Sequence, residues 1–94
     1  MEITEKFIVV NKLGLHLRAA AELVKTAHKF KCKIKVRKQG LAADARSLMN
    51  LIALGAAYGS ELAVTFEGED AWPASRAFAD LFKTGFREME TAVA

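Results

Sequence analysis

The chain has 94 residues, of which 52% are hydrophobic and 27% are charged. This balance favours one small folded domain over residues 1–94 and excludes a disordered chain. No run reaches the ~18 apolar residues that cross a bilayer, and the first ten residues lack the basic-then-apolar pattern of a signal peptide. With a net charge of +3 and one cysteine, we expect a cytoplasmic protein with no internal disulfide and no membrane partner.

Metal or cofactor chemistry is not expected from the cysteine and the two histidines. Cys32 lies in an alternating segment in which Ile34 and Val36 share its face, so we predict a buried core thiol. A zinc site needs several Cys and His ligands at short, regular spacing, and the sequence has no such cluster. We therefore expect no metal and no cofactor.

The first two predicted elements are a strand over residues 3–10 and a helix over residues 17–29. The strand segment is rich in β-branched and aromatic residues, although its imperfect alternation leaves the inward face open. The helical segment carries apolar residues at i, i+3 and i+4 spacing. Gly14, His16 and Arg18 therefore lie at a predicted helix entrance.

The third predicted element is a strand over residues 32–38, in which basic and apolar residues alternate. Six lysines and arginines fall between Lys29 and Lys38, which raises nucleic acid as a partner. The alternation is typical of the solvated face of a half-buried strand, and the run lacks the interleaved aromatic residues that stack on bases. We expect no nucleic-acid partner and keep a small basic nucleic-acid binder as the weakest alternative.

The remaining elements are a short strand over residues 41–44, a short helix, a strand over residues 62–68 and a final helix. Ser47 is the predicted N-cap of the short helix, and Gly55 its end. Asp70 is the predicted cap of the final helix, Trp72 is expected to pack against the sheet edge, and Gly85 should end this helix. The element order predicts an α+β fold of two layers, with one sheet and its helices on one face.

His16 raises the main question about chemistry, because it occupies the N-cap position or the residue beside it. The helix dipole disfavours imidazolium there and keeps the ring nucleophilic. The unpaired N–H groups of the first helical turn, together with Arg18, would hold an anion beside the ring. These features suit a histidine that accepts a phosphoryl group. A histidine at a helix start is nevertheless more often a structural cap, so the pattern alone leaves both interpretations open.

Three segments resemble the histidine-containing phosphocarrier (HPr) family of the bacterial phosphoenolpyruvate-dependent phosphotransferase system. Around His16, the residues Gly14, Leu15, Arg18 and Ala20 match the family pattern Gly-Leu-His-Ala-Arg-Pro-Ala. Residues 46–55, RSLMNLIALG, resemble the second family signature, and the ending FEGEDAW…LFKTGF resembles the last strand and helix. The resemblance covers nearly the whole chain. It implies a βαββαβα open-faced sandwich, with an antiparallel sheet of order 1-4-2-3 and three helices on one face.

The resemblance also implies a function. His16 would carry a phosphoryl group on Nδ1, and Arg18 would stabilise that group. The donor would be phosphorylated Enzyme I, with phosphoenolpyruvate as the ultimate source, and the acceptor would be a histidine of an Enzyme IIA domain in sugar transport. The protein would be a monomeric carrier and not an enzyme, because its partners complete each transfer.

Further site residues follow from the second signature. Ser47 matches the position that an HPr kinase/phosphorylase modifies in part of the family, although a helix cap alone also explains a serine there. By resemblance, Leu48, Met49 and Ile52 belong to the surface that docks partners, and burial in the core is the other interpretation for these three residues. Leu17, beside His16, is expected to alter this partner surface.

The sequence departs from the family pattern at two positions. Leu17 replaces alanine, and Ala19 replaces the proline of the first helical turn. We expect the helix start to survive, because alanine has high helix propensity and adds an N–H donor. His28 is expected to be an ordinary helix residue. The main alternative function is a regulatory module, nitrogen-related or Ser47-phosphorylated, that does not feed sugar transport.

Overall fold

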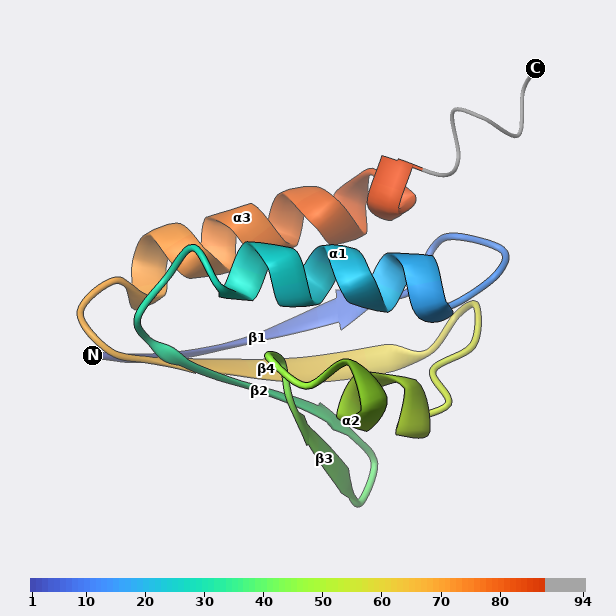
Figure 1. Cartoon of the computed structure of the whole chain (residues 1–94), viewed down its shortest axis with the longest axis horizontal. Helices are drawn as coiled ribbons and strands as arrows, with labels where there is room; N and C mark the ends of the chain where they lie inside the picture. Colours follow the sequence, from blue (N-terminus) through green and yellow to red (C-terminus); the bar gives the residue numbers. More distant parts are fainter. Residues whose placement is uncertain (88–94) are drawn as a thin grey trace.

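The computed structural model describes residues 1–87, which form a four-stranded sheet covered by three α-helices (Figure 1). The strands are β1 (Glu2–Ile8), β2 (Lys33–Lys38), β3 (Leu41–Asp44) and β4 (Glu61–Glu67). The helices are α1 (Leu17–Ala27), α2 (Leu48–Ala53) and α3 (Ala71–Lys83), and a 3₁₀ turn, η1 (Gly85–Arg87), follows. This order confirms the predicted α+β fold, and α3 ends before Gly85 as expected.

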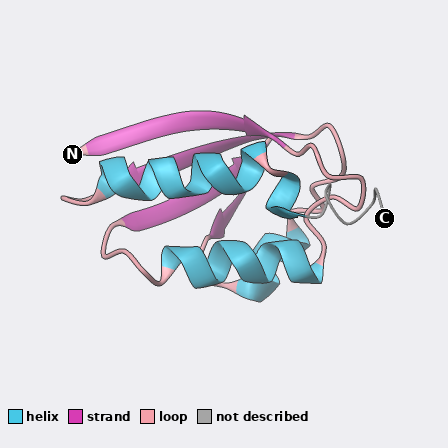
Figure 2. Cartoon of the chain, turned by 90° about the horizontal axis from the view of Figure 1, so that it is seen from above, coloured by secondary structure: helices cyan, strands magenta, loops and turns pink. Residues whose placement is uncertain are grey.

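The sheet is antiparallel throughout and has the order β1-β4-β2-β3, as the resemblance implied. Helices α1 and α3 lie side by side and run in opposite directions across one face of it (Figures 1 and 2). Helix α2 contacts both α1 and β3. Helix α1 runs along the long axis of the molecule, so its start and its end lie toward opposite ends (Figure 1).

The core lies between the two layers and follows the alternation of the strands. Leu62, Val64 and Phe66 of β4 are fully buried beneath the helices. The ring of Phe66 meets that of Phe78 edge to face, with centroids 5.2 Å apart, a geometry that aromatic pairs prefer. Cys32 is 2% exposed, which confirms the predicted core thiol. Burial raises its pKa to about 11, so the thiol stays protonated at neutral pH.

The other face of the sheet is open to solvent. Lys33, Lys35 and Arg37 of β2 are exposed there, whereas Ile34 and Val36 between them are buried. The basic run is therefore the solvated face of a half-buried strand, as its alternation predicted.

The structure corrects the bounds of the first two predicted elements. Strand β1 ends at Ile8, because Val9 bonds instead to the loop before β4: its N–H donates to the carbonyl of Ser60 at 2.9 Å. Helix α1 ends at Ala27, after which the N–H groups of Lys29 and Phe30 close tighter turns. The inward face of β1 is also settled: the residues that point to the helical layer are Ile3, Glu5 and Phe7, and Glu5 forms an ion pair with Arg76 of α3.

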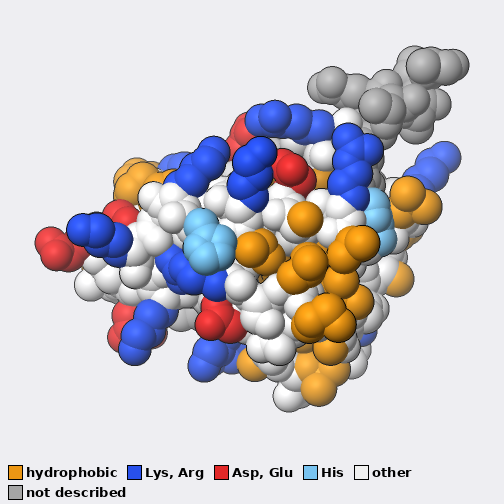
Figure 3. Space-filling view, in the orientation of Figure 1, with side chains coloured by type: hydrophobic (Ala, Val, Ile, Leu, Met, Phe, Trp, Pro, Cys, Tyr) orange, Lys and Arg blue, Asp and Glu red, His pale blue; other side chains and the backbone are white. Residues whose placement is uncertain are grey.

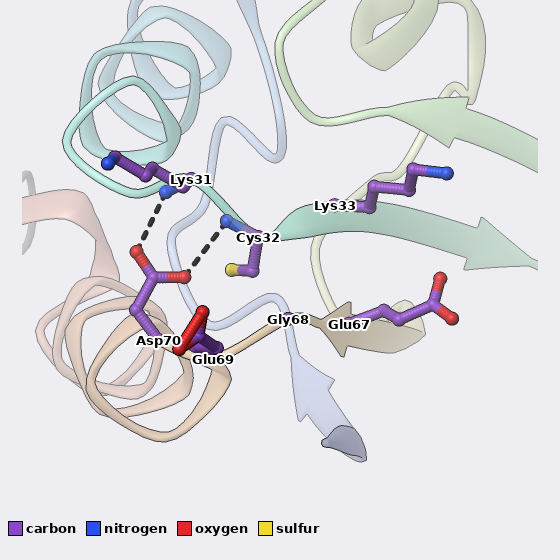
Figure 4. Close-up of a pocket in the computed structure, with 7 residues that line it drawn as sticks. All are labelled: Lys31, Cys32, Lys33, Glu67, Gly68, Glu69 and Asp70. Carbon is purple, nitrogen blue, oxygen red and sulfur yellow. Dashed lines mark hydrogen bonds between the residues drawn. The ribbon is translucent and has the colours of Figure 1, made fainter.

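Asp70 is the N-cap residue of α3, but its side chain makes no capping hydrogen bond. The carboxylate instead accepts the backbone N–H groups of Lys31 at 2.7 Å and Cys32 at 2.9 Å (Figure 4). The prediction of the position was right, whereas the predicted role was wrong. The side chain ties the entrance of β2 to the start of α3, where Gly68 also passes so close to Cys32 that a Cβ on the glycine would lie 2.8 Å from the cysteine Cβ.

The expectation that Trp72 packs against the sheet edge is wrong. The residue is 56% exposed, and the Arg76 guanidinium lies over its ring, 4.9 Å from the centroid. The two residues are four apart, so they share one side of α3. Arg76 also pairs with Glu5 of the edge strand β1, so this side of α3 flanks the sheet edge, yet the Trp72 side chain remains largely exposed to solvent.

Candidate functional site

His16 is the N-cap residue of α1 and is half-buried. Its backbone is extended (φ −78°, ψ −178°), and its carbonyl accepts the N–H of Ala20 at 2.9 Å. The ring turns toward the helix, so that Nδ1 accepts the backbone N–H of Arg18 at 3.3 Å. A nitrogen that accepts carries a lone pair and no proton, which places the proton of the neutral ring on Nε2. Nδ1 therefore carries a lone pair, and it faces the helix start.

The start of α1 is arranged to receive negative charge. The first-turn N–H groups of a helix have no partner within the helix and lie at the positive end of its dipole. No acidic residue lies in this first turn to occupy them. Arg18 is exposed beside His16, and its guanidinium can form paired hydrogen bonds to a phosphoryl group. His16, Arg18 and the N–H groups that could bind an anion thus all belong to the start of α1.

The segment before His16 is held close to the loop that follows α2. The N–H of Leu15 donates to the carbonyl of Ala56 at 2.8 Å. At Gly14 the backbone has φ +70°, and a Cβ there would lie 2.7 Å from the carbonyl oxygen of Ala56. Only glycine combines this backbone conformation with so close an approach. The position of His16 therefore depends on the packing of two loops as well as on α1.

Ser47 is the N-cap residue of α2, as predicted, and its Oγ accepts the N–H of Asn50 at 3.2 Å. The preceding Arg46 reaches the end of α1, where its guanidinium donates to the carbonyls of Ala27 and Phe30. Helices α1 and α2 contact each other. His16 and Ser47 thus lie at the starts of two neighbouring helices, and the structure gives the serine a structural role.

The residues that were expected to dock partners divide into two groups. Met49 is 71% exposed and Leu17 is 61% exposed, whereas Leu48 and Ile52 are half-buried against the core. We call these four residues the apolar patch. Figure 3 shows hydrophobic side chains gathered over α2 and the start of α1, with lysines and arginines beside them over α1 and α3. An exposed apolar surface of this kind is typical of an interaction site.

Two further exposed apolar residues were missed by sequence reasoning. Leu13 is 73% exposed and Tyr58 is 65% exposed. They lie in the two loops that are joined by the hydrogen bond from Leu15 to Ala56. The available signal was position, because each residue directly precedes a glycine and lies outside the predicted strands and helices.

The other candidate groups do not join this site. His28 is exposed at the C-cap of α1, the end opposite to His16. Within residues 1–87, no group of three or more His, Cys, Asp or Glu side chains could hold a metal ion. No helix in the same part of the chain is long and apolar enough to cross a membrane.

The chain is similar to known proteins over most of its length. The family model for the PTS HPr component phosphorylation site matches residues 3–84. A phosphocarrier protein HPr of Xylella fastidiosa is 38% identical over 86 residues, which cover 92% of this chain and 97% of the relative. A phosphocarrier protein HPr of Neisseria meningitidis is 38% identical over 82 residues, covering 87% of this chain and 92% of the relative.

Solved structures give the same answer at the level of the fold. HPr from Thermoanaerobacter tengcongensis superposes with a TM-score of 0.84 at 38% identity, covering 94% of this chain and 97% of that chain. Crh, a catabolite repression protein of Bacillus subtilis described as a swapped dimer, has a TM-score of 0.71 at 31% identity, covering 79% and 85% of the two chains. Sequence, fold and matched phosphorylation-site region together show that the chain belongs to the HPr phosphocarrier family of the phosphotransferase system.

Proposed function

We propose that His16 is the phosphoryl acceptor and that Nδ1 forms the new bond. The Nδ1 lone pair attacks phosphorus, the N–P bond of a donor phosphohistidine breaks, and its electron pair returns to the donor nitrogen. The proton on Nε2 stays in place throughout, so no general base is required. The observation that carries this proposal is the hydrogen bond from the Arg18 N–H to Nδ1, because it requires a lone pair on that nitrogen.

The role proposed for Arg18 is to hold the phosphoryl oxygens during transfer. Its backbone N–H already points at the ring, and it would turn to a phosphoryl oxygen once Nδ1 is occupied. The guanidinium would add charge-assisted hydrogen bonds, which are about twice as strong as neutral ones. The free N–H groups of the first turn would complete the anion site.

The proposed donor is phosphorylated Enzyme I, and the proposed acceptors are Enzyme IIA domains. The apolar patch would contact both, and the nearby basic side chains would speed encounter with acidic partner surfaces. We place the carrier in the cytoplasm as a monomeric domain over residues 1–94, with no enzymatic activity of its own and no nucleic-acid or membrane partner. These assignments rest on the family and on a site built within one chain.

Ser47 is proposed as a second modification site, used by an HPr kinase/phosphorylase. Its position at a helix N-cap tolerates added negative charge. A phosphate there would also lie next to Leu48 and Met49 of the apolar patch. It would therefore weaken the docking of acidic partners.

Incubation with phosphoenolpyruvate, Mg²⁺ and Enzyme I tests the assignment. We expect an acid-labile mass gain of one phosphate that is absent from His16→Ala and present in His28→Ala. The result that would overturn the proposal is no gain in the unmodified protein, or a gain that survives in His16→Ala. Onward transfer to a sugar-specific Enzyme IIA domain then separates sugar transport from the regulatory alternative, to which the Crh likeness lends some weight.

A further inference from the structure

Asn11 is a buried polar residue in the segment that leads to His16. It is 1% exposed and lies in the loop between β1 and α1, five residues before His16. A buried amide costs free energy unless its hydrogen bonds are made. An asparagine in this position therefore indicates a specific polar role.

Two hydrogen bonds join Asn11 to Gly14. The backbone carbonyl of Asn11 accepts the N–H of Gly14 at 3.1 Å. The side-chain Nδ2 donates to the carbonyl oxygen of Gly14 at 2.7 Å. Asn11 thus holds the N–H and the carbonyl of the same glycine and closes the turn on both sides.

This turn determines where the next two residues go. Gly14 is in close contact with Ala56 and Ala57, and the following N–H, that of Leu15, donates to Ala56. His16 comes next and caps α1. The carbonyl that Asn11 holds belongs to the peptide unit that supplies this Leu15 N–H. If the peptide unit rotated, the hydrogen bond to Ala56 and the path into His16 would change together.

We propose that Asn11 is a positioning residue for phosphoryl transfer by His16, an inference that rests on the function proposed above. Its amide fixes the Gly14–Leu15 peptide, and this fixes the imidazole with Nδ1 at the start of α1. An aspartate has the same shape but cannot donate to the Gly14 carbonyl at neutral pH. An alanine removes the donor without adding a buried charge. Misplacement of a reacting group by ~1 Å can cost about a hundredfold in rate.

The test compares Asn11→Asp and Asn11→Ala with a control, Val64→Ala, which lowers stability from the centre of the sheet. For each protein we would measure the unfolding free energy, the rate of phosphorylation against Enzyme I concentration, and the ¹⁵N chemical shifts of the His16 ring. We expect the saturating rate to fall about tenfold or more in the Asn11 variants. The half-saturating concentration should hardly change, because the apolar patch is intact. The ¹⁵N shifts should show that the preference for the proton on Nε2 is weakened.

Failure of the proposed function and failure of the positioning role of Asn11 would give different results. If the unmodified protein is not phosphorylated on His16, the proposed function fails. If it is phosphorylated, and the folded Asn11 variants match Val64→Ala in saturating rate and in ¹⁵N shifts, the positioning role is wrong. Asn11→Ala decides the matter if the buried charge of Asn11→Asp prevents folding.

Discussion

At the scale of single residues, the proposed function requires that a ring nitrogen and a guanidinium contact the same phosphoryl group. His16 presents Nδ1 to the helix start, and Arg18 contributes its backbone N–H and an exposed side chain. The arginine matters for its planar, forked geometry as well as for its charge. This distinction leads to a test in which the charge is kept.

We expect Arg18→Lys to lower the rate of phosphorylation by Enzyme I about tenfold, which corresponds to ~1.4 kcal/mol of lost stabilisation. The lysine keeps the positive charge but cannot form paired hydrogen bonds to the phosphoryl oxygens. Rapid-quench measurement of phosphate incorporation gives the rate. Arg37→Lys, on the solvent face of the sheet, is the matched control and should leave the rate unchanged. Equal rates for the two variants would contradict the role of Arg18.

Ala19 provides a second test, because its N–H belongs to the first turn and the proline of the family pattern has none. We expect Ala19→Pro to shorten the lifetime of the phosphohistidine several-fold by removing one donor. The loss of phosphate at neutral pH measures the lifetime. Ala19→Gly keeps the N–H and costs ~1 kcal/mol of helix stability. A lifetime reduced in Ala19→Gly but not in Ala19→Pro would exclude the N–H as the cause.

Sequence reasoning placed His16 and Ser47 at helix N-caps, which the structure confirms, whereas the roles proposed for His16, Arg18 and Ser47 came from the family resemblance. It did not find the role of Asn11, which depends on a turn that closes three residues later. It also placed Trp72 in a packed position, since a large aromatic residue alone does not reveal which side of a helix faces solvent. Features set by neighbouring residues, such as N-cap positions, were predictable from the sequence. Contacts that depend on how the chain folds in space were not.

At the scale of elements, strands and helices followed from periodicity, while the connections did not. The alternation in β2 and β4 predicted which residues are buried. Asp70 is an example of a connection that periodicity did not predict. A carboxylate before a helix predicts a cap, but in the structure this carboxylate accepts two N–H groups of the distant segment that leads into β2. The close approach of Gly68 to Cys32 brings these two segments together.

The Asp70 connection predicts a dependence of stability on pH. The hydrogen bond from the Lys31 N–H, reinforced by Cys32, lowers the pKa of Asp70 below its usual value of 3.8. The unfolded chain therefore binds the proton more readily than the folded one. The stabilisation is fully present above the unfolded pKa and is lost as the pH falls through the lowered folded value.

We therefore expect Asp70→Asn to be less stable than the unmodified protein at neutral pH, with the difference shrinking below about pH 4. Urea unfolding at a series of pH values measures it. Glu69→Gln, the adjacent exposed carboxylate, should follow the unmodified protein throughout. A constant difference between Asp70→Asn and the unmodified protein from pH 7 to pH 2 would show that the ionised carboxylate is not what stabilises the connection.

At the scale of the whole molecule, the two ends of the helical layer have different characters. The end that carries the start of α1 also carries the apolar patch, whereas the start of α3 carries the exposed Trp72 at the other end (Figures 1 and 3). Both ends expose large apolar side chains. Only the first combines them with a histidine at a helix N-terminus.

We expect Met49→Ser to raise the half-saturating concentration of Enzyme I about tenfold, because an exposed apolar contact is lost. The saturating rate should stay the same, and stability should change by less than ~0.5 kcal/mol, since the side chain is 71% exposed. Trp72→Ser is the matched control and should behave like the unmodified protein. If Trp72→Ser weakens the interaction and Met49→Ser does not, docking uses the other end of the molecule.

The proposed function places the phosphoryl group on Nδ1 of His16. The most direct test is to phosphorylate ¹⁵N-labelled protein with phosphoenolpyruvate and Enzyme I and to locate the phosphorus by ³¹P–¹⁵N coupling. We expect one phosphorus bonded to Nδ1 of His16 and none in His16→Ala. Phosphorus on Nε2 of His16, on His28 or on Ser47 in this reaction would contradict it.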